Sequence, residues 1–486
     1  MEYRTAAQLL QALRAREVSA GELAEQAIRR IESEDRRLNA VVVRDFERAR
    51  GAARAADAAL ARGEARPLLG LPMTVKESFN LAGHPSTWGV PGTQKQAVPQ
   101  DAVAVARLKQ AGAVILGKTN VSINLGDWQA YNPVYGVTSN PWDVARTPGG
   151  SSGGAAAALA AGYVPLELGS DLAGSLRVPA HFCGVFAHKP THNLVPPRGH
   201  APPGAPLLSV SPSIDLGVVG PMARSAQDLQ LALDVLAGPD AAEATAYALR
   251  LPPPRHAALR DYRVLVIDAH PLTPTDDGIR ALLAAMAQKL EKAGCQVGRA
   301  SPLLPDLALL GRTYIKLLMA FIGTAMPQEA YAQAQRRAAA LAGDDIGAIG
   351  KRSLAASHRD WMQAHFVRNA IAHRWREVFK EWDVVLCPVM PCAAFRHDHR
   401  PMDERTVTVN GATLAYDLLP LWSSLATLTG QPATAMPIGL DAAGLPVGMQ
   451  IIGPYLEDRT TLAFAALAEQ AFGGFVAPSA GSATRS

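Results

Sequence analysis

The sequence is poor in cysteine, and its cysteines follow no recognisable pattern. The 486 residues contain four of them, Cys183, Cys295, Cys387 and Cys392. No two form a Cys-x-x-Cys pair, and no metal-ligand spacing is present. So few cysteines in a chain of this length exclude a disulfide scaffold and favour buried, reduced thiols. We therefore expect a cytoplasmic protein without a metal site.

Long hydrophobic runs and dense runs of charge are also missing. The most apolar stretch, residues 155–168, is mostly alanine, contains Pro165 and Glu167, and is too short to span a bilayer. The N-terminus has no apolar segment typical of a signal peptide. The net charge is only +4, without the lysine and arginine density of a nucleic-acid-binding arm. We expect neither a membrane nor a nucleic acid as a partner.

Hydrophobic periodicity predicts helices over the first sixty residues. Thr5 can cap a first helix, and Ser19 with Glu22 can form a capping box for a second. A helix with an arginine-rich solvent face is expected over 45–61.

Short apolar runs bounded by glycine and proline predict strands in the rest of the chain. Strands are expected at 71–75, which ends at Lys76, at 113–116, at 164–168 as an edge-like strand, and at 384–387. Helices are expected over 102–110, 154–161 and 223–236, and almost throughout 307–382. A βαβ unit is expected over 263–297 and a hairpin over 434–452. Alternating strands and helices predict an α/β fold with a parallel or mixed sheet covered on both faces.

The stretch from 147 to 175 carries the chemistry. It contains Pro-Gly-Gly-Ser-Ser-Gly-Gly, which includes Ser151 and Ser152, and later Gly-Ser-Asp-Leu-Ala-Gly-Ser, which ends at Ser175. Glycine permits turns that are closed to other residues and lets backbone N–H groups approach a ligand. A serine in such a turn can therefore act as a nucleophile beside an oxyanion-binding cradle.

Lys76 is the candidate base for such a serine. Amide hydrolysis needs a group that takes the proton of the nucleophile, and no histidine lies between residues 149 and 175. A lysine can serve once its amine is neutral, because burial lowers a lysine pKa by several units from about 10.4. Lys76 follows an apolar strand, as such a lysine should. The spacing alone favours a simpler interpretation, an ion pair such as one with Asp171.

The glycine-rich loop allows three further interpretations. Residues 149–153 match the Gly-x-Ser-x-Gly nucleophile elbow, although residues 146–148 do not have the pattern of a core strand. Glycine-rich turns before helices also bind phosphate, but the Walker lysine is missing. The glycines can also serve only to let a helix pack closely.

Taken together, these segments resemble the amidase signature family, and the resemblance extends over residues 5–472. The matching segments are 70–77, 117–120, 135–136, 140–143, 149–154, 169–180, 182–186, 189–191, 220–225 and 444–450. The resemblance implies an α/β fold with a large mixed central sheet covered on both faces by helices, with N-terminal helices and a helical insertion. It also implies hydrolysis of a small-molecule amide without a metal or organic cofactor.

Five segments are expected within this fold. They are an N-terminal helical segment (1–64), the amidase signature core (65–250), a βαβ and helical region that roofs the site (251–400), a C-terminal part of the same α/β fold (401–472) and a flexible tail (473–486). A homodimer is compatible with the sequence.

The resemblance implies three catalytic residues by position. Ser175 closes the Asp-x-x-Gly-Ser turn and is the implied nucleophile. Ser151, held by a cis peptide from Gly150, is the implied bridging serine. Lys76 is the implied general base, which takes the proton of Ser175 through Ser151 and later serves as the acid for the leaving amine.

The resemblance also implies the groups around them. The backbone N–H groups of Leu172, Ala173, Gly174 and Ser175 would form the oxyanion hole. Asp171 and Arg177 are expected to pair and hold that turn, and Ser152 is expected to be structural.

The sequence departs from the family pattern near the site. Ala173 replaces the first of two glycines before the nucleophile, and Ser170 stands where threonine is usual. Ile123 replaces an acidic residue and is followed by Asp-Trp-Gln at 127–129, while His-Asn-Leu at 192–194 replaces a frequent Gly-Arg pair. These departures bear on the choice of substrate more than on the chemistry.

The leading hypothesis is a stand-alone hydrolase of carboxylic amides, with aryl amides, carbamates or esters as further substrates. One alternative is the glutamine-hydrolysing A subunit of a tRNA-dependent amidotransferase, which would need partner subunits and a tRNA; Ile123 leans against it. Another is an α/β-hydrolase with a Ser-His-Asp triad built on Ser151 or Ser152 and His397. A non-catalytic scaffold is disfavoured because Lys76, Ser151 and Ser175 are all present.

Overall fold

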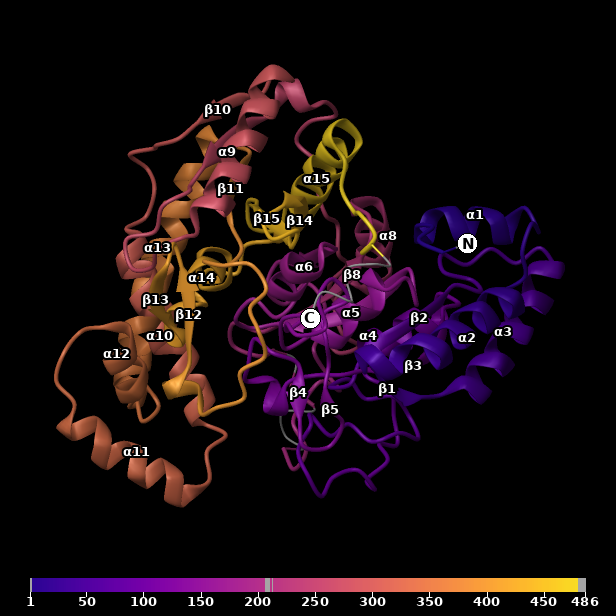
Figure 1. Cartoon of the computed structure of the whole chain (residues 1–486), viewed down its shortest axis with the longest axis horizontal. Coiled ribbons are helices and arrows are strands. Elements are labelled where there is room, and N and C mark those ends of the chain that lie inside the picture. Colours follow the sequence, from indigo (N-terminus) through magenta and orange to yellow (C-terminus); the bar gives the residue numbers. More distant parts are fainter. Residues whose placement is uncertain (1, 206–209, 212, 480–486) are drawn as a thin grey trace.

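The computed structural model describes residues 2–205, 210–211 and 213–479 (Figure 1). Its main sheet is formed by β1 (Val41–Arg44), β2 (Pro72–Lys76), β3 (Val114–Thr119), β6 (Leu166–Asp171), β7 (Phe186–Lys189), β8 (Val218–Ala223), β9 (Arg263–Val266), β10 (Gln296–Gly298), β11 (Val384–Pro388), β14 (Ala433–Leu440) and β15 (Pro446–Ile452). Two small hairpins stand apart from it, β4 (Tyr131–Asn132) with β5 (Gly136–Val137) and β12 (Thr406–Val409) with β13 (Ala412–Ala415).

The main sheet has eleven strands in the order β1-β3-β2-β6-β8-β7-β14-β15-β11-β9-β10. β2 runs parallel to β3 and β6, and β9 runs parallel to β10 and β11. The other neighbours are antiparallel. The prediction of a large mixed sheet in an α/β fold is therefore confirmed.

Helices pack around this sheet and extend beyond it. They are α1 (Ala6–Arg14), α2 (Ala20–Leu38), α3 (Phe46–Ala61), α4 (Val103–Gln110), α5 (Gly153–Ala160), α6 (Arg177–Cys183), α8 (Ala226–Leu236), α9 (Asp277–Lys292), α10 (Leu307–Gly323), α11 (Gln328–Ala340), α12 (Ile346–Ser353), α13 (His358–Glu381), α14 (Leu421–Thr427) and α15 (Asp458–Phe472). Figure 1 shows α1–α3 at one end of the molecule and α10–α13 at the other. None of the described helices is long and apolar enough to cross a membrane.

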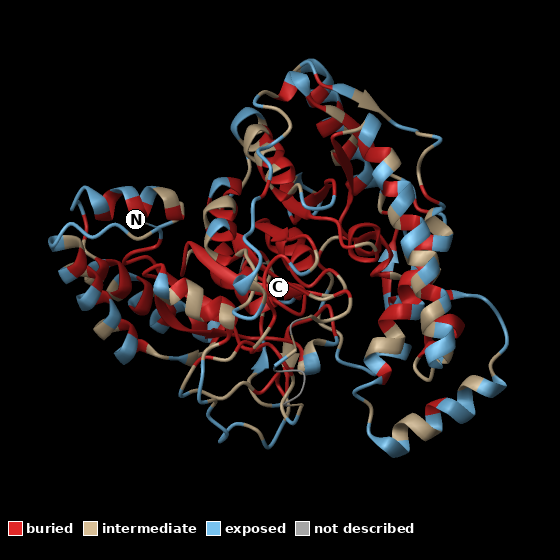
Figure 2. Ribbon diagram, turned by 180° about the vertical axis from the view of Figure 1, so that it is seen from behind, coloured by how far each residue is buried: buried red, intermediate tan, exposed pale blue. Residues whose placement is uncertain are grey.

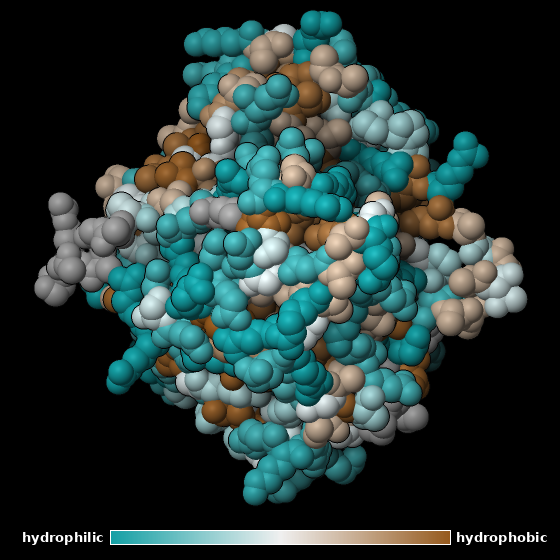
Figure 3. Space-filling view, turned by 90° about the vertical axis from the view of Figure 1, so that its right-hand side faces the viewer, coloured by the Kyte–Doolittle hydropathy of each residue, from teal (hydrophilic) through white to brown (hydrophobic). Residues whose placement is uncertain are grey.

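The predicted helix starts are confirmed at the N-terminus. Thr5 caps α1 and exchanges hydrogen bonds with Gln8, and Ser19 caps α2 in a capping box with Glu22. The helix expected at 45–61 is α3. On this side of the molecule the surface is mostly hydrophilic, with apolar side chains only in small patches (Figure 3).

Two secondary-structure predictions were wrong, for identifiable reasons. The first sixty residues are not all helical, because the run of three valines at 41–43 forms β1, which pairs with β3. The predicted edge-like strand at 164–168 is instead β6, an interior strand between β2 and β8. Pro165 is compatible with this interior position, because it precedes the first residue of β6 and its missing N–H removes no ladder bond.

The second half of the chain follows the prediction more closely. β9, α9 and β10 form the expected βαβ unit, with Gln296 in register with Arg263. Residues 307–382 are almost entirely α10–α13, and β14 with β15 forms the expected hairpin. The helix predicted at 223–236 begins later, at Ala226, because 218–223 forms β8.

The two ends of the described chain meet. The ring of Phe475 lies 5.8 Å from that of Tyr3, and Arg224 lies over it. The flexible tail expected at 473–486 stays a prediction for residues 480–486, which lie outside the described residues.

Candidate active site

Lys76 is the last residue of β2 and is completely buried. Its Nζ lies 2.7 Å from Ser151 Oγ and 3.0 Å from Ser170 Oγ. No carboxylate of the described residues lies within ion-pair distance of it; Asp171 pairs with Arg177 instead. The simple ion-pair interpretation of Lys76 is therefore wrong.

The sheet explains why these groups meet. β2 and β6 are parallel neighbours, with Thr74 beside Glu167 and Val75 beside Leu168. The carboxyl ends of parallel strands lie at the same edge of a sheet. Lys76 therefore ends up next to Ser170, near the point where β6 gives way to the glycine-rich turn.

The environment of Lys76 favours the neutral amine. Burial lowers the pKa of Lys76 to about 7, against the opposing effect of the negative charges at Asp171 and Glu167. A neutral amine offers a lone pair, so it can accept the hydroxyl proton of Ser151 while it donates a hydrogen bond to Ser170. This arrangement can remove a proton from a serine at neutral pH.

Glu167 is a second buried titratable group behind the lysine, and no sequence pattern marks it. Burial raises the pKa of its carboxyl to about 8. Thr74 donates a hydrogen bond to it at 2.5 Å, and the Leu168 N–H donates another at 3.0 Å. Thr74 and Lys76 are two residues apart on β2, so their side chains lie on the same face of the sheet. Glu167 is in register with Thr74, and its side chain lies on that face as well.

Ser151 is presented by the glycine-rich loop before α5. The Gly150–Ser151 peptide is cis, as the resemblance implied. A Cβ at Gly150 would lie 2.3 Å from the Asp127 carbonyl oxygen and 2.6 Å from the Gln129 nitrogen. Only glycine fits there, because the loop packs directly against the backbone of residues 127–129.

Ser152 joins the two serine-bearing loops through the backbone. Its N–H donates to the Ser175 carbonyl at 3.3 Å, and its hydroxyl donates to the Ser170 carbonyl at 3.3 Å. These contacts suit the structural role expected for it.

The turn that carries Ser175 lies between β6 and α6 and is organised by Asp171. The carboxylate of Asp171 accepts the N–H groups of Gly174, at 2.8 Å, and Leu176, at 3.1 Å. Arg177 binds both of its oxygens, at 2.9 and 3.0 Å, and also contacts Thr427 and Gln450. Burial alone would raise the pKa of Asp171, but the Arg177 guanidinium outweighs it and holds that pKa below its usual value. The expected Asp171–Arg177 pair is present.

One of the four N–H groups expected to form the oxyanion hole is already bound within the protein. The N–H of Gly174 is engaged by Asp171 Oδ1 and does not face an open site. The N–H groups of Leu172, Ala173 and Ser175 have no acceptor among the residues that the structure describes. Three of the four N–H groups are therefore without a protein acceptor in the described part of the chain.

His397 makes no hydrogen bond to the serines of the proposed triad. One ring nitrogen lies 3.3 Å from the Val144 carbonyl oxygen, and the other has no partner in the described part of the chain. No described histidine is hydrogen-bonded to Ser151, Ser152 or Ser175, so the Ser-His-Asp alternative is wrong. Within the same residues no group of three or more His, Cys, Asp or Glu side chains could hold a metal ion.

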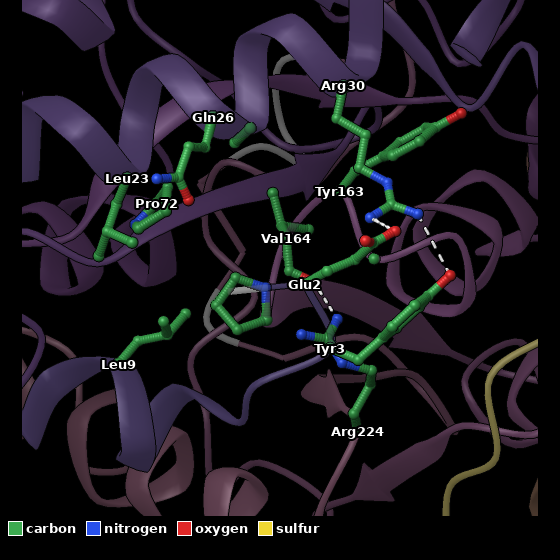
Figure 4. Close-up of a pocket in the computed structure, with 13 residues that line it drawn as sticks. Glu2, Tyr3, Leu9, Leu23, Gln26, Arg30, Pro72, Tyr163, Val164 and Arg224 are labelled. Carbon is green, nitrogen blue, oxygen red and sulfur yellow. Dashed lines mark hydrogen bonds and ion pairs between the residues drawn. The ribbon is translucent and has the colours of Figure 1, made fainter. Parts of the chain in front are cut away.

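Two cavities lie apart from these residues. One, of about 230 Å³, is lined by the N-terminal segment with Arg30, Tyr163 and Arg224 (Figure 4). The other, of about 470 Å³, is lined by residues 192–194 together with Tyr247 and Tyr455. The unusual His-Asn-Leu segment thus shapes a cavity that none of the three catalytic candidates lines.

Comparison with known proteins identifies the class of the molecule. A family model described as amidase matches residues 22–462. The chain therefore belongs to the amidase signature family, and it is an amide hydrolase that acts on carbon–nitrogen bonds.

Individual relatives differ in what they are named for. The A subunit of glutamyl-tRNA(Gln) amidotransferase from Anaeromyxobacter sp. (strain K) is 33% identical over 503 residues, which covers 96% of this chain and 95% of that protein. A solved structure from a vestigial protein complex linked to the origins of an s-triazine catabolic enzyme is 28% identical, with a TM-score of 0.81 over 98% of this chain and 100% of that one. A bacterial aryl acylamidase of the amidase signature family has a TM-score of 0.79 at 24% identity, over 97% of each chain, and supports the fold alone.

Proposed function

We propose that this protein hydrolyses carboxylic amides through an acyl-enzyme on Ser175, with Ser151 as proton relay and Lys76 as general base and acid. The observation that carries the proposal is the buried Lys76 amine, 2.7 Å from Ser151 Oγ and without a carboxylate partner among the described residues. Such a lysine is rare in a structural role, because an unpaired buried ammonium is costly.

In the first half of the reaction Ser175 Oγ attacks the amide carbonyl carbon. Its proton passes to Ser151 Oγ, whose own proton passes to the lone pair of Lys76 Nζ. The negative charge that develops on the carbonyl oxygen is stabilised by N–H groups of Leu172, Ala173 and Ser175. Removal of one such donor typically costs about 10²–10³ in kcat.

In the second half the tetrahedral intermediate collapses. The Lys76 ammonium returns a proton through Ser151 to the leaving nitrogen, the carbon–nitrogen bond breaks, and the amine departs. Water then attacks the ester on Ser175 with the same groups in reverse order and releases the acid. Aryl amides, carbamates and esters pass through the same type of intermediate, so we include them as substrates.

Glutamine is the second candidate substrate. Relatives named as the A subunit of glutamyl-tRNA(Gln) amidotransferase align with almost the whole chain at 33% identity, and they favour this candidate over a stand-alone hydrolase. The same serine and lysine would then release ammonia from glutamine, and the chain would work with partner subunits and a tRNA. The departures at Ile123 and Ala173 lean toward a different substrate. In either case the four free, buried cysteines suit the cytoplasm.

A substrate panel separates the two candidates. The purified chain is incubated with aliphatic amides, anilides, carbamates and glutamine, and the released amine or ammonia is measured. Hydrolysis of anilides or carbamates without a partner supports the stand-alone enzyme, whereas activity on glutamine that rises with added amidotransferase subunits supports the other. Ser175→Ala should abolish every activity, while Ser353→Ala, which changes a buried hydroxyl on α12, should not. Full activity in Ser175→Ala would refute the proposed nucleophile.

A further inference from the structure

The turn that bears Ser175 is held from outside by two aromatic side chains. Tyr314, on α10, donates its hydroxyl to the Leu172 carbonyl at 3.0 Å. Trp128 donates its indole N–H to the Ala173 carbonyl at 2.9 Å. Both donors come from segments far from the turn in sequence, and they bind consecutive carbonyls of the proposed oxyanion hole.

The Tyr314 bond sets the direction of one oxyanion donor, and the Trp128 bond fixes the peptide that follows it. A peptide unit is planar and trans, so its C=O and N–H point in opposite directions. With the Leu172 carbonyl fixed by Tyr314, the Ala173 N–H of the same peptide is turned to the other side. The next peptide is fixed at both ends, since Trp128 binds the Ala173 carbonyl and Asp171 accepts the Gly174 N–H. The Ala173 N–H is thus held in one direction, and no described acceptor binds it.

Trp128 is itself rigidly supported. Its ring meets Tyr416 edge to face, with the ring centroids 5.4 Å apart. Tyr416 donates to one oxygen of Asp127 at 2.6 Å, and Arg405 binds the other at 2.5 Å. Asp127 and Arg405 are both almost completely buried, so this pair is shielded from water.

The same segment also supports the loop that carries Ser151. The backbone of residues 127–129 is the surface against which Gly150 packs, with no room for a Cβ. Residues 127–129 therefore contact both serine-bearing loops. Their backbone packs against the loop of Ser151, and the Trp128 indole binds the turn of Ser175. This segment fixes the position of one loop relative to the other.

From these contacts we propose that Trp128 and Tyr314 are positioning residues for the oxyanion donors of the Leu172–Ser175 turn: Tyr314 orients the Ala173 N–H, and Trp128 holds the adjoining Ala173–Gly174 peptide in place. The proposal rests on the proposed function, because it gives the turn a catalytic task. Neither side chain needs to touch the substrate: each acts through a backbone carbonyl.

The variants Trp128→Phe and Tyr314→Phe test this role with minimal change. Each removes one hydrogen-bond donor and keeps an aromatic ring. Trp142→Phe is the matched control for the first, because the Trp142 indole donates to the Cys183 carbonyl at 3.0 Å in an equally buried place. Tyr163→Phe is the control for the second, because this buried hydroxyl has no partner among the described residues.

The readout is acylation of Ser175 by p-nitrophenyl acetate, followed as release of p-nitrophenol, with the rate of Ser175→Ala subtracted. We expect the maximal acylation rate to fall about tenfold in each variant, less than for loss of a donor itself, while the half-saturating concentration changes less than about twofold. Both controls should keep the rate of the unmodified protein. Thermal unfolding of all four variants shows whether they are folded.

Three outcomes overturn the inference. The first is an unchanged rate in folded Trp128→Phe and Tyr314→Phe. The second is an equal loss in the controls, and the third is a higher half-saturating concentration at unchanged maximal rate, which would make the rings only part of the binding surface. The proposed function fails separately, when Ser175→Ala reacts as fast as the unmodified protein or when the unmodified protein is not acylated at all.

Discussion

The glycine-rich core and helix α11 are built in opposite ways. Every residue of α5 is buried, and the loops beside it approach one another at backbone distance. In α11 only Ala334 is buried, and Figure 2 shows this helix projecting from the body of the molecule. The core therefore constrains residue types position by position, whereas α11 constrains little beyond helix formation. Substitutions should therefore be costly in the first region and tolerated in the second.

The largest effect should come from removal of the proposed base. Lys76→Ala should lower the acylation rate by about 10³ or more, because Lys76 is the only described side chain hydrogen-bonded to the Ser151 hydroxyl. Lys118→Met changes another fully buried lysine, which lies 3.8 Å from Glu77, and is the matched control. It should lower the melting temperature but leave the rate of the folded protein in place. Equal rates in both variants would contradict the role of Lys76.

Gly150→Ala should be the next most damaging change. An added methyl would collide with the backbone of residues 127–129, which cannot move away without displacing Trp128. We expect a loss of about 1–3 kcal/mol in the free energy of unfolding, together with a lower acylation rate. Denaturant titration and kinetics measure the two. Gly51→Ala on α3, where a Cβ would meet only the side chain of Arg54 at 4.0 Å, should not destabilise the protein.

The pH dependence of the acylation rate tests the glycine-rich core without changing how it is packed. Because neutral Lys76 is the proposed base and its pKa is lowered to about 7, the acylation rate should rise with pH and level off above that value. Because its own pKa is raised to about 8, Glu167 is mostly protonated over the rising part of this profile, so Glu167→Gln should move that part by less than about 0.3 pH unit. pH–rate profiles of both proteins test this expectation, and a shift of half a pH unit or more would contradict a protonated Glu167 beside Lys76.

The smallest effect should come from α11. Arg337→Ala changes an exposed side chain for which no contact with the site is seen in the described residues. We expect a change in unfolding free energy below about 0.5 kcal/mol and an unchanged acylation rate. A large kinetic effect would show that α11 reaches the substrate.

Much of the fold could be predicted because local chemistry specified it. The caps at Thr5 and Ser19 gave the first two helix starts, and the apolar run before Lys76 gave β2. The interior position of β6 could not be deduced, because strand order depends on pairing between distant segments. A local feature such as Pro165 does not indicate that pairing. β1 was missed although three consecutive valines marked it.

The glycine, serine and lysine patterns of the sequence predicted the proposed site, whereas no pattern predicted the residues that support it. Ser170 and Glu167 contact or face Lys76 only because β2 and β6 are neighbours. Trp128 and Tyr314 act through carbonyl oxygens, so no motif marks them, although Trp128 lies in the segment that departs from the family pattern. The commitment of the Gly174 N–H to Asp171 depends on backbone geometry that no residue pattern shows.

The order of strands has a consequence for biosynthesis. The last hairpin, β14 with β15, lies in the middle of the sheet, between β7 and β11. Until residues 433–452 leave the ribosome, the strands made earlier form two separate blocks, each with an open edge where the hairpin will insert. Open edges invite pairing with other chains. A nascent chain of this protein therefore stays vulnerable to aggregation until nearly all of it has been translated.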